Sequence, residues 1–151
     1  MRHPRHGAAL GVWFFLASVA LGAQSAQFSG DVLLTEQLTV ADAVYLVGLA
    51  VGIVPIDSPF DDAPNHLTRA GIRVPEATPD SPISLGEYAF LIVQAFDLPG
   101  GLMYGFFPGP RYALRELVYL DVVEPGAHTG ERLTGRSALT ILASAMEEFG
   151  Q

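Results

Sequence analysis

ISLGEYAFLIVQAF, residues 83–96, is one of three similar stretches in the chain; the others are LTVADAVYLVGLAV at 38–51 and LTGRSALTILASAM at 133–146. In each copy an aliphatic residue is followed by Ser or Thr, and apolar residues then recur in the same register. Four sets of matching positions are Leu46, Leu91 and Ile141; Val47, Ile92 and Leu142; Ala50, Ala95 and Ala145; and Val51, Phe96 and Met146. Apolar spacings of three and four residues line one face of a helix. The copies are therefore predicted to be equivalent helices of an internal repeat.

The start of each predicted helix has the residues of an N-cap. A Ser or Thr there can accept a hydrogen bond from a first-turn backbone N–H that has no partner inside the helix. The residue pairs at the cap and three positions later are Ser84 with Glu87, Thr39 with Asp42, and Thr134 with Ser137. Glu87 completes a capping box, Asp42 makes a weaker version, and Ser137 leaves the third box incomplete. We therefore interpret the two acids as caps rather than as catalytic groups.

A second correspondence joins the helices into larger units. HLTRAGIRVPEATPDSPI at 66–83 aligns with ELVYLDVVEPGAHTGERL at 116–133, a period of 50 residues, whereas the first two helices are 45 apart. Each unit is predicted to contain a short helix, an irregular loop rich in Pro and Gly, and a longer capped helix. The sequence thus predicts an all-α domain of about two and a half units over residues 38–151, preceded by a linker or cap at 27–37.

The N-terminus has the pattern of a secretory signal peptide. Arg2 and Arg5 precede an apolar run at 8–21, and the small or polar residues 22–26 follow it. The run of roughly 14 residues is shorter than the ~20 that a membrane-spanning helix needs. We expect cleavage near residue 26 and no stable membrane span afterwards, the alternative being an uncleaved N-terminal anchor. The expected location is the periplasm or the cell envelope.

Charge and cysteine content exclude several classes of function. Without Arg2 and Arg5, six arginines remain against sixteen Asp and Glu, a net charge of −10. An acidic surface disfavours nucleic acid and anionic lipid headgroups as partners. The chain has no cysteine, so it has no disulfide, thiolate metal site or lipidated cysteine.

One stretch of the sequence combines aromatic residues with Gly and Pro. LPGGLMYGFFPGPRY at 98–112 cannot be one regular helix, because Gly and Pro interrupt it. Its candidate binding residues are Tyr104, Phe106, Phe107, Arg111 and Tyr112. They could form a surface that binds a partner or stacks on a glycan. The alternative, which we favour, is that the aromatic side chains fill the core between successive units.

The arrangement resembles the S-layer homology module, in which a short helix precedes a longer helix that opens with Ile/Leu-Thr-Arg-Ala-Glu. The matching residues here are 38–42, 83–87 and 133–137, and the resemblance spans about residues 38–150. It implies attachment of an exported protein to cell-wall polysaccharide, with the signature arginine as a principal ligand contact. That position holds Val40, Leu85 and Gly135, none of them cationic. Arg136 is one position away, which turns it about 100° aside on a helix.

The predicted function is therefore an exported, non-catalytic envelope module for attachment to a cell-wall polymer or glycan, or for envelope scaffolding, with Arg115 and Arg136 as further candidate contacts. A protein–protein adaptor that uses residues 98–112 is the alternative, and the oligomeric state stays open. A small hydrolase would need His66 or His128 to meet a carboxylate or hydroxyl, which no motif indicates. The acidic residues at 57, 61 and 62 lack the spacing of an EF-hand, so no metal or cofactor is expected.

Overall fold

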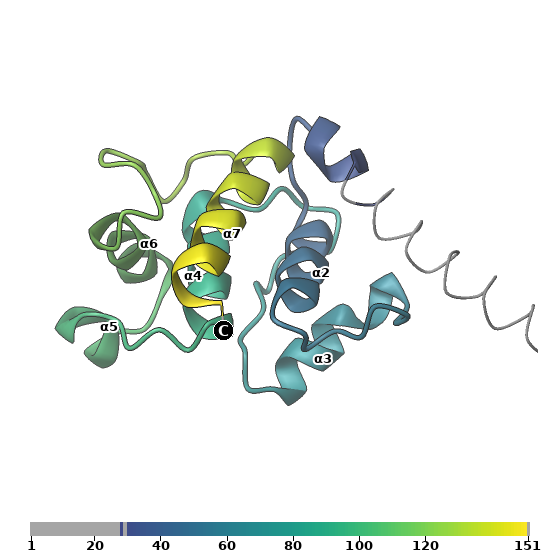
Figure 1. Ribbon diagram of the computed structural model, residues 1–151, viewed down its shortest axis with the longest axis horizontal. Helices are drawn as coiled ribbons and strands as arrows, with labels where there is room; N and C mark the ends of the chain where they lie inside the picture. The colour runs from purple at the N-terminus through teal and green to yellow at the C-terminus, as the bar shows by residue number, and fades with distance from the viewer. Residues whose placement is uncertain (1–27, 29, 151) are drawn as a thin grey trace, which may run out of the picture.

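The computed structural model describes residue 28 and residues 30–150, so the expected signal peptide at 1–26 lies outside the described part. This part is predominantly helical, and its only strand-like pairings are two isolated β-bridges. The prediction of an all-α fold is confirmed. The elements in chain order are α2 (Val40–Ala50), the 3₁₀ helix η1 (Phe60–Asp62), α3 (Ala63–Arg69), α4 (Leu85–Ala95), α5 (Leu102–Phe106), α6 (Pro110–Tyr119) and α7 (Gly135–Phe149). Figure 1 labels the α-helices among them.

The three longer helices α2, α4 and α7 begin where the sequence places their caps. The Ser84 hydroxyl accepts from the Glu87 backbone N–H at 3.3 Å, and the Glu87 carboxylate accepts from the Ser84 N–H at 2.9 Å. Thr39 and Asp42 form the same reciprocal pair, a complete capping box. Thr134 accepts from the Ser137 N–H at 3.1 Å without a carboxylate in return. These caps confirm the predicted helix starts.

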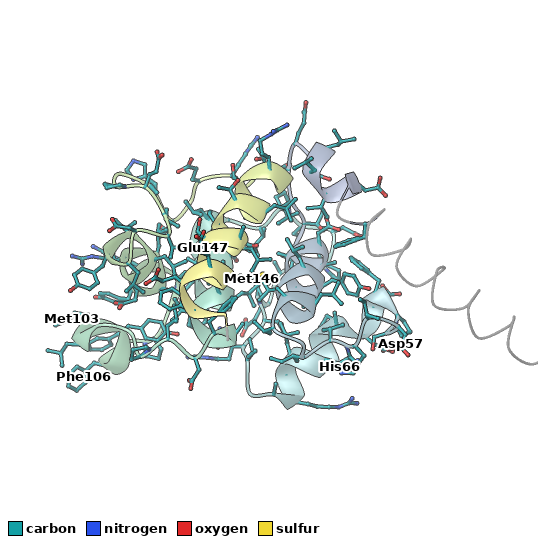
Figure 2. All side chains as sticks on the ribbon, in the orientation of Figure 1. Asp57, His66, Met103, Phe106, Met146 and Glu147 are labelled. Carbon is teal, nitrogen blue, oxygen red and sulfur yellow. The ribbon has the colours of Figure 1, made fainter. Side chains whose placement is uncertain are left out.

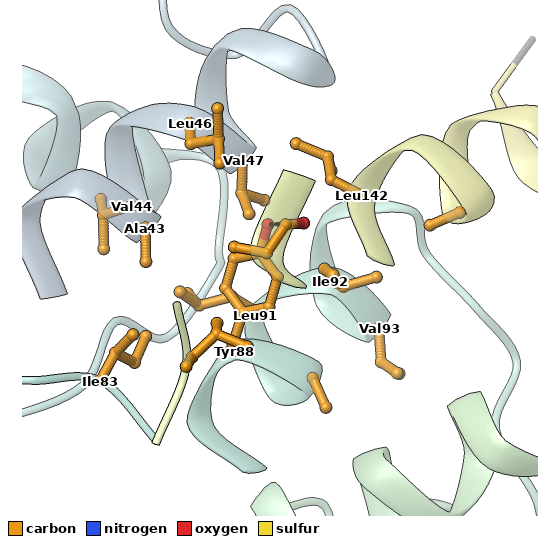
Figure 3. Close-up of a cluster of buried hydrophobic side chains, with 14 of the residues drawn as sticks. Ala43, Val44, Leu46, Val47, Ile83, Tyr88, Leu91, Ile92, Val93 and Leu142 are labelled. Carbon is orange, nitrogen blue, oxygen red and sulfur yellow. Dashed lines mark hydrogen bonds between the residues drawn. The ribbon is translucent and has the colours of Figure 1, made fainter. Parts of the chain in front are cut away.

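The residues just before the three caps meet in the interior. Leu38, Ile83 and Leu133 are almost completely buried. The Leu38 N–H donates to the Leu133 carbonyl at 2.8 Å, and the Ile83 N–H donates to the Leu38 carbonyl at 2.9 Å. Tyr88 is buried beside them, with its hydroxyl donating to the Ala138 carbonyl at 3.1 Å, among the side chains of Figure 3. The three helix starts therefore converge on one core.

The first backbone N–H groups of α2, α4 and α7 donate hydrogen bonds to neighbouring segments. In each case the acceptor lies in the segment that precedes another of these three helices. The N–H groups of Val40 and Ala41 in α2 donate to carbonyls of the loop before α4, at Ser81 and Pro79. In the same way α4 donates to the loop before α7, from Leu85 to Glu131 and from Gly86 to Thr129. The first N–H of α7, that of Gly135, donates to the Thr35 carbonyl at 2.9 Å, in the segment before α2. The three contacts are cyclic, so residues 30–37 close the arrangement.

The contact that closes the cycle, between the start of α7 and residues 30–37, is a close approach of two backbones. A Cβ atom on Gly135 would overlap the carbonyl of Val32, and only glycine lets the two backbones approach this closely. Val32 itself is 2% exposed, whereas Leu34 is 79% exposed. Val32 is therefore the residue of this segment that joins the core.

The two short helices, α3 and α6, have matching buried residues 50 positions apart. Ala63 and Leu67 of α3 are fully buried, as are their counterparts Ala113 and Leu117 of α6. Both helices end in the same way: the residue at 71 or 121 has a positive φ, and the next N–H returns to the Leu67 or Leu117 carbonyl. The left-handed residue is glycine in the first unit and Asp121 in the second, both types that tolerate this conformation.

Helix α7 differs from its two counterparts in how much of its surface is buried. α2 and α4 bury residues on several sides, whereas α7 buries one stripe, composed of Gly135, Ala138, Leu142 and Ala145. Its outer side carries exposed residues, among them Arg136, Thr140 and Glu147. No short helix covers this side in the described part of the chain. The outer side of α7 is therefore a mostly polar face.

Candidate functional site

The signature positions of the family resemblance lie inside the fold. Val40 and Leu85 are buried first residues of α2 and α4, and Gly135 is the buried first residue of α7. Their backbone N–H groups are already bound by neighbouring loops. These three positions therefore present no polar or charged side chain to a ligand, although Leu85 lines an apolar part of a cleft described below.

The two signature carboxylates are engaged in the caps. The Asp42 carboxylate accepts from the Thr39 N–H at 3.3 Å and from the Thr39 hydroxyl at 2.6 Å. The Glu87 carboxylate accepts from the Ser84 N–H at 2.9 Å and from the Ser84 hydroxyl at 2.7 Å. The interpretation of both acids as helix caps agrees with this geometry.

The aromatic stretch does not fill the core, so the alternative that we favoured from the sequence is wrong. Leu102 is 74% exposed, Met103 51%, Phe106 69% and Phe107 65%. The reason is local, because α5 is a single turn held between Gly and Pro residues and turns only one large side chain inward. That side chain is Tyr104, whose ring lies 6.2 Å from the Phe90 ring of α4.

Tyr104 belongs to a small cluster at the base of α5. The Arg73 guanidinium lies 5.1 Å from the centre of the Phe90 ring, a cation–π contact. The Gln94 side chain accepts from the Arg73 N–H at 2.9 Å and donates to the Arg73 carbonyl at 3.2 Å. Burial raises the pKa of the Tyr104 hydroxyl, and the nearby Arg73 charge opposes part of this rise. The cluster fixes α5 to the body of the domain.

A basic hollow lies between α6 and the loop before α7. Its volume is about 620 Å³, and we call it the α6 hollow. Arg111, Arg115 and Tyr119 line it from α6, at spacings of four residues that place them on one side of the helix. His128 and Thr129 line it from the loop, and no carboxylate is among the lining residues. The hollow is therefore a cationic site with an aromatic wall.

A second cleft adjoins the first. Its volume is about 480 Å³, and Gly126 and Ala127 line both cavities. Arg132 and Arg136 contribute positive charge to it, but Glu124 and Glu131 line it as well. Four of the six arginines beyond residue 26 thus lie around one loop, all of them exposed.

The structure separates the candidate residues into two groups. Arg111 and Arg115 meet in the α6 hollow, with Arg136 in the adjoining cleft, whereas the aromatic candidates line neither cavity: Tyr104, Phe106, Phe107 and Tyr112. Sequence reasoning missed Tyr119, which is 81% exposed, and Arg132. The spacing of four residues between Arg111, Arg115 and Tyr119 could have indicated that all three lie on one side of a helix.

The corresponding surface of the first unit has a different charge. Fifty residues before Arg111 and Arg115 the chain has Asp61 and Asn65, and Arg69 precedes Tyr119 by the same interval. The paired arginines are therefore a feature of the second unit and not of the repeat itself.

The remaining candidates are His66 and the acidic residues that precede α3. His66 Nε2 lies 3.3 Å from the Ser58 hydroxyl, but the cap carboxylates that a hydrolase would use are engaged elsewhere. The acidic residues at 57, 61 and 62 are exposed near the start of α3. Within the described residues, no three His, Asp or Glu side chains gather closely enough to hold a metal ion.

Comparison with known proteins identifies no relative: no family model, no curated protein and no solved structure matches the chain. Within residue 28 and residues 30–150, the helices are all too short or too polar to cross a membrane.

Proposed function

We propose that the chain is an exported, non-catalytic module of the cell envelope, of S-layer homology type, which binds an anionic wall polymer in the α6 hollow. The observation that carries the proposal is the pairing of Arg111 and Arg115 in an acid-free hollow, on a chain whose net charge is −8. Such a concentration of positive charge on an acidic protein favours a local anionic ligand over general attraction to polyanions.

The residue types of the hollow suit an acidic sugar. Guanidinium groups bind carboxylate or phosphate through two parallel hydrogen bonds, which Leu or Val at the signature positions cannot provide. The exposed ring of Tyr119 offers an apolar face for a sugar ring, and Thr129 and His128 add polar groups across the hollow. The proposed ligand site thus replaces the lost signature arginines with cations from the preceding short helix.

The test is co-sedimentation of the chain from residue 27 with cell-wall sacculi, before and after the wall polysaccharide is removed. Every core residue among those described lies between Val32 and Ala145, so this chain keeps the described core. We expect saturable binding that weakens with salt and is lost with the polysaccharide.

The variant Arg111→Ala/Arg115→Ala should lower the affinity at least tenfold, because each charge-assisted hydrogen bond is worth about 1.5–3 kcal/mol. Arg69→Ala is the matched control, since Arg69 is an exposed arginine of the other short helix. Equal binding by the double variant and the control would contradict the assignment of the hollow. Absence of binding to intact sacculi would contradict the proposed function.

A further inference from the structure

The exposed apolar side chains of α5 form a protruding surface that the polymer site does not use. We define the α5 tip as Leu102, Met103, Phe106 and Phe107. Figure 2 shows labelled Met103 and Phe106 at the outer edge of the molecule, pointing away from the body. These two side chains of the tip therefore project from the body of the domain.

The composition of the tip is unusual for a surface exposed to water. Residues 98–110 contain no charged side chain, and the Tyr104 hydroxyl is their only polar side-chain group. Tyr104 turns inward toward Phe90 and leaves the four tip residues outside. A protein partner is normally bound with a rim of polar contacts, about one hydrogen bond per 100–200 Å². The tip has no side chain that could supply one.

The size of the tip also argues against a protein partner. From the exposed fractions of its four side chains, the tip presents on the order of 500 Å² of apolar surface. A stable protein interface takes about 800 Å² from each partner, and a tip facing a second copy of itself would bury less than that. A small apolar projection can instead enter the fluid boundary of a bilayer, which needs no complementary shape.

One cationic side chain lies at the base of α5, and a second follows the tip in the sequence. Arg73 packs on Phe90 beside Tyr104, and Arg111 lies in the first turn of the helix that follows the tip. The nearby carboxylate of Glu116 is engaged, since it accepts from the Gly101 N–H at 2.6 Å. Asp97, at the end of α4, is the nearest acidic residue before the tip in sequence. Apolar side chains with the Arg73 guanidinium behind them match the order of acyl chains and headgroups in a bilayer.

We propose that the α5 tip inserts into the interfacial layer of a lipid bilayer, with Arg73 at the level of the headgroups. This contact holds the domain on a membrane surface without spanning it. The proposal rests on the tip alone and stands whether or not the α6 hollow binds a polymer.

The test uses a tryptophan as a local probe. The only tryptophan of the chain is Trp13, so the full chain with Trp13→Phe and Phe106→Trp has a single indole, at the tip. The matched control is Trp13→Phe with Ile56→Trp, which places the indole at an exposed apolar position outside both the tip and the α6 hollow. Both variants are mixed with vesicles of phosphatidylcholine and phosphatidylglycerol, and then with vesicles of the same lipids that have brominated acyl chains. The same measurements are repeated on chains that start at residue 27.

The proposal predicts a shift of the indole emission at position 106 to shorter wavelength, and quenching by the brominated chains. The control indole should show neither change. Adding Phe107→Ser should lower the vesicle partition coefficient about tenfold, as expected when one buried aromatic ring is lost. An unchanged spectrum at position 106, or equal quenching at both positions, would overturn the proposal. So would a concentration-dependent dimer in sedimentation velocity that is abolished by Phe107→Ser, because the tip would then bind a second copy.

Discussion

Gly135→Ala tests the closing contact between the N-terminal segment and α7. The added Cβ would overlap the Val32 carbonyl, so the segment has to move away from the helix. Displacing Val32 exposes a buried valine, at about 1.5–3 kcal/mol. Losing the hydrogen bond from the Gly135 N–H to Thr35 removes about 0.5–1.5 kcal/mol more. Alanine returns at most about 1 kcal/mol through its helix propensity, so the expected net destabilisation is about 1–4 kcal/mol.

The assay is equilibrium unfolding in urea, with limited proteolysis of residues 28–37 in the absence of urea. Gly30→Ala is the control, because Gly30 lies in the helical turn of the same segment and a Cβ added there would have no described atom within 4 Å. We expect the control to match or slightly exceed the wild-type stability and Gly135→Ala to expose the segment to protease. A Gly135→Ala chain with the wild-type midpoint and protease resistance would refute the inferred role of this contact.

Three further changes test the caps, the core and the tip. Ser84→Ala should lower the free energy of unfolding by about 1 kcal/mol without a selective loss of polymer binding, measured by urea unfolding and co-sedimentation; a selective loss would show that the cap contacts ligand. Burial raises the pKa of Tyr88 far above the ordinary 10.0, so the unfolded chain releases this proton first and stability should fall above pH 10 by up to about 1.4 kcal/mol per pH unit. Tyr88→Phe should remove this contribution to the alkaline slope, and an unchanged slope in urea titrations at pH 9 to 11 would count against it. Phe106→Ser/Phe107→Ser should leave the unfolding midpoint nearly unchanged, because both rings are exposed; a large fall would mean that they belong to the core.

Much of the fold could be predicted because its signals are local. Hydroxyl caps at Thr39, Ser84 and Thr134 and their apolar successors determine where three helices start, independently of the rest of the chain. Leu67 and Leu117, at matching positions of the two short helices, reveal the 50-residue interval in the sequence, because both are buried in the core. The closing contact could not be predicted in this way. It depends on two backbones whose sequences, around Val32 and Gly135, have no common pattern.

The α6 hollow was harder to predict from the sequence than the helices, because it is formed by two separate segments. Arg111 and Arg115 were named, but the hollow that they share also needs Tyr119 and a loop whose path no local rule specifies. The tip was misjudged for another reason. Aromatic residues predict burial on average, and a single turn between glycines can turn only Tyr104 toward the core.

The cyclic pattern of backbone contacts has a consequence for how the chain folds. The ribosome synthesises the segment around Val32 early and α7 late. The two pack against each other in the folded domain, although roughly a hundred residues separate them in the sequence. Contacts this far apart in sequence form slowly, because a long loop must close before they contribute any stability. A growing chain can therefore assemble α2, α3 and α4 in order but cannot complete the cyclic arrangement until α7 has been synthesised. The two ends of the domain should accordingly gain protection from hydrogen exchange together, in the final step of folding.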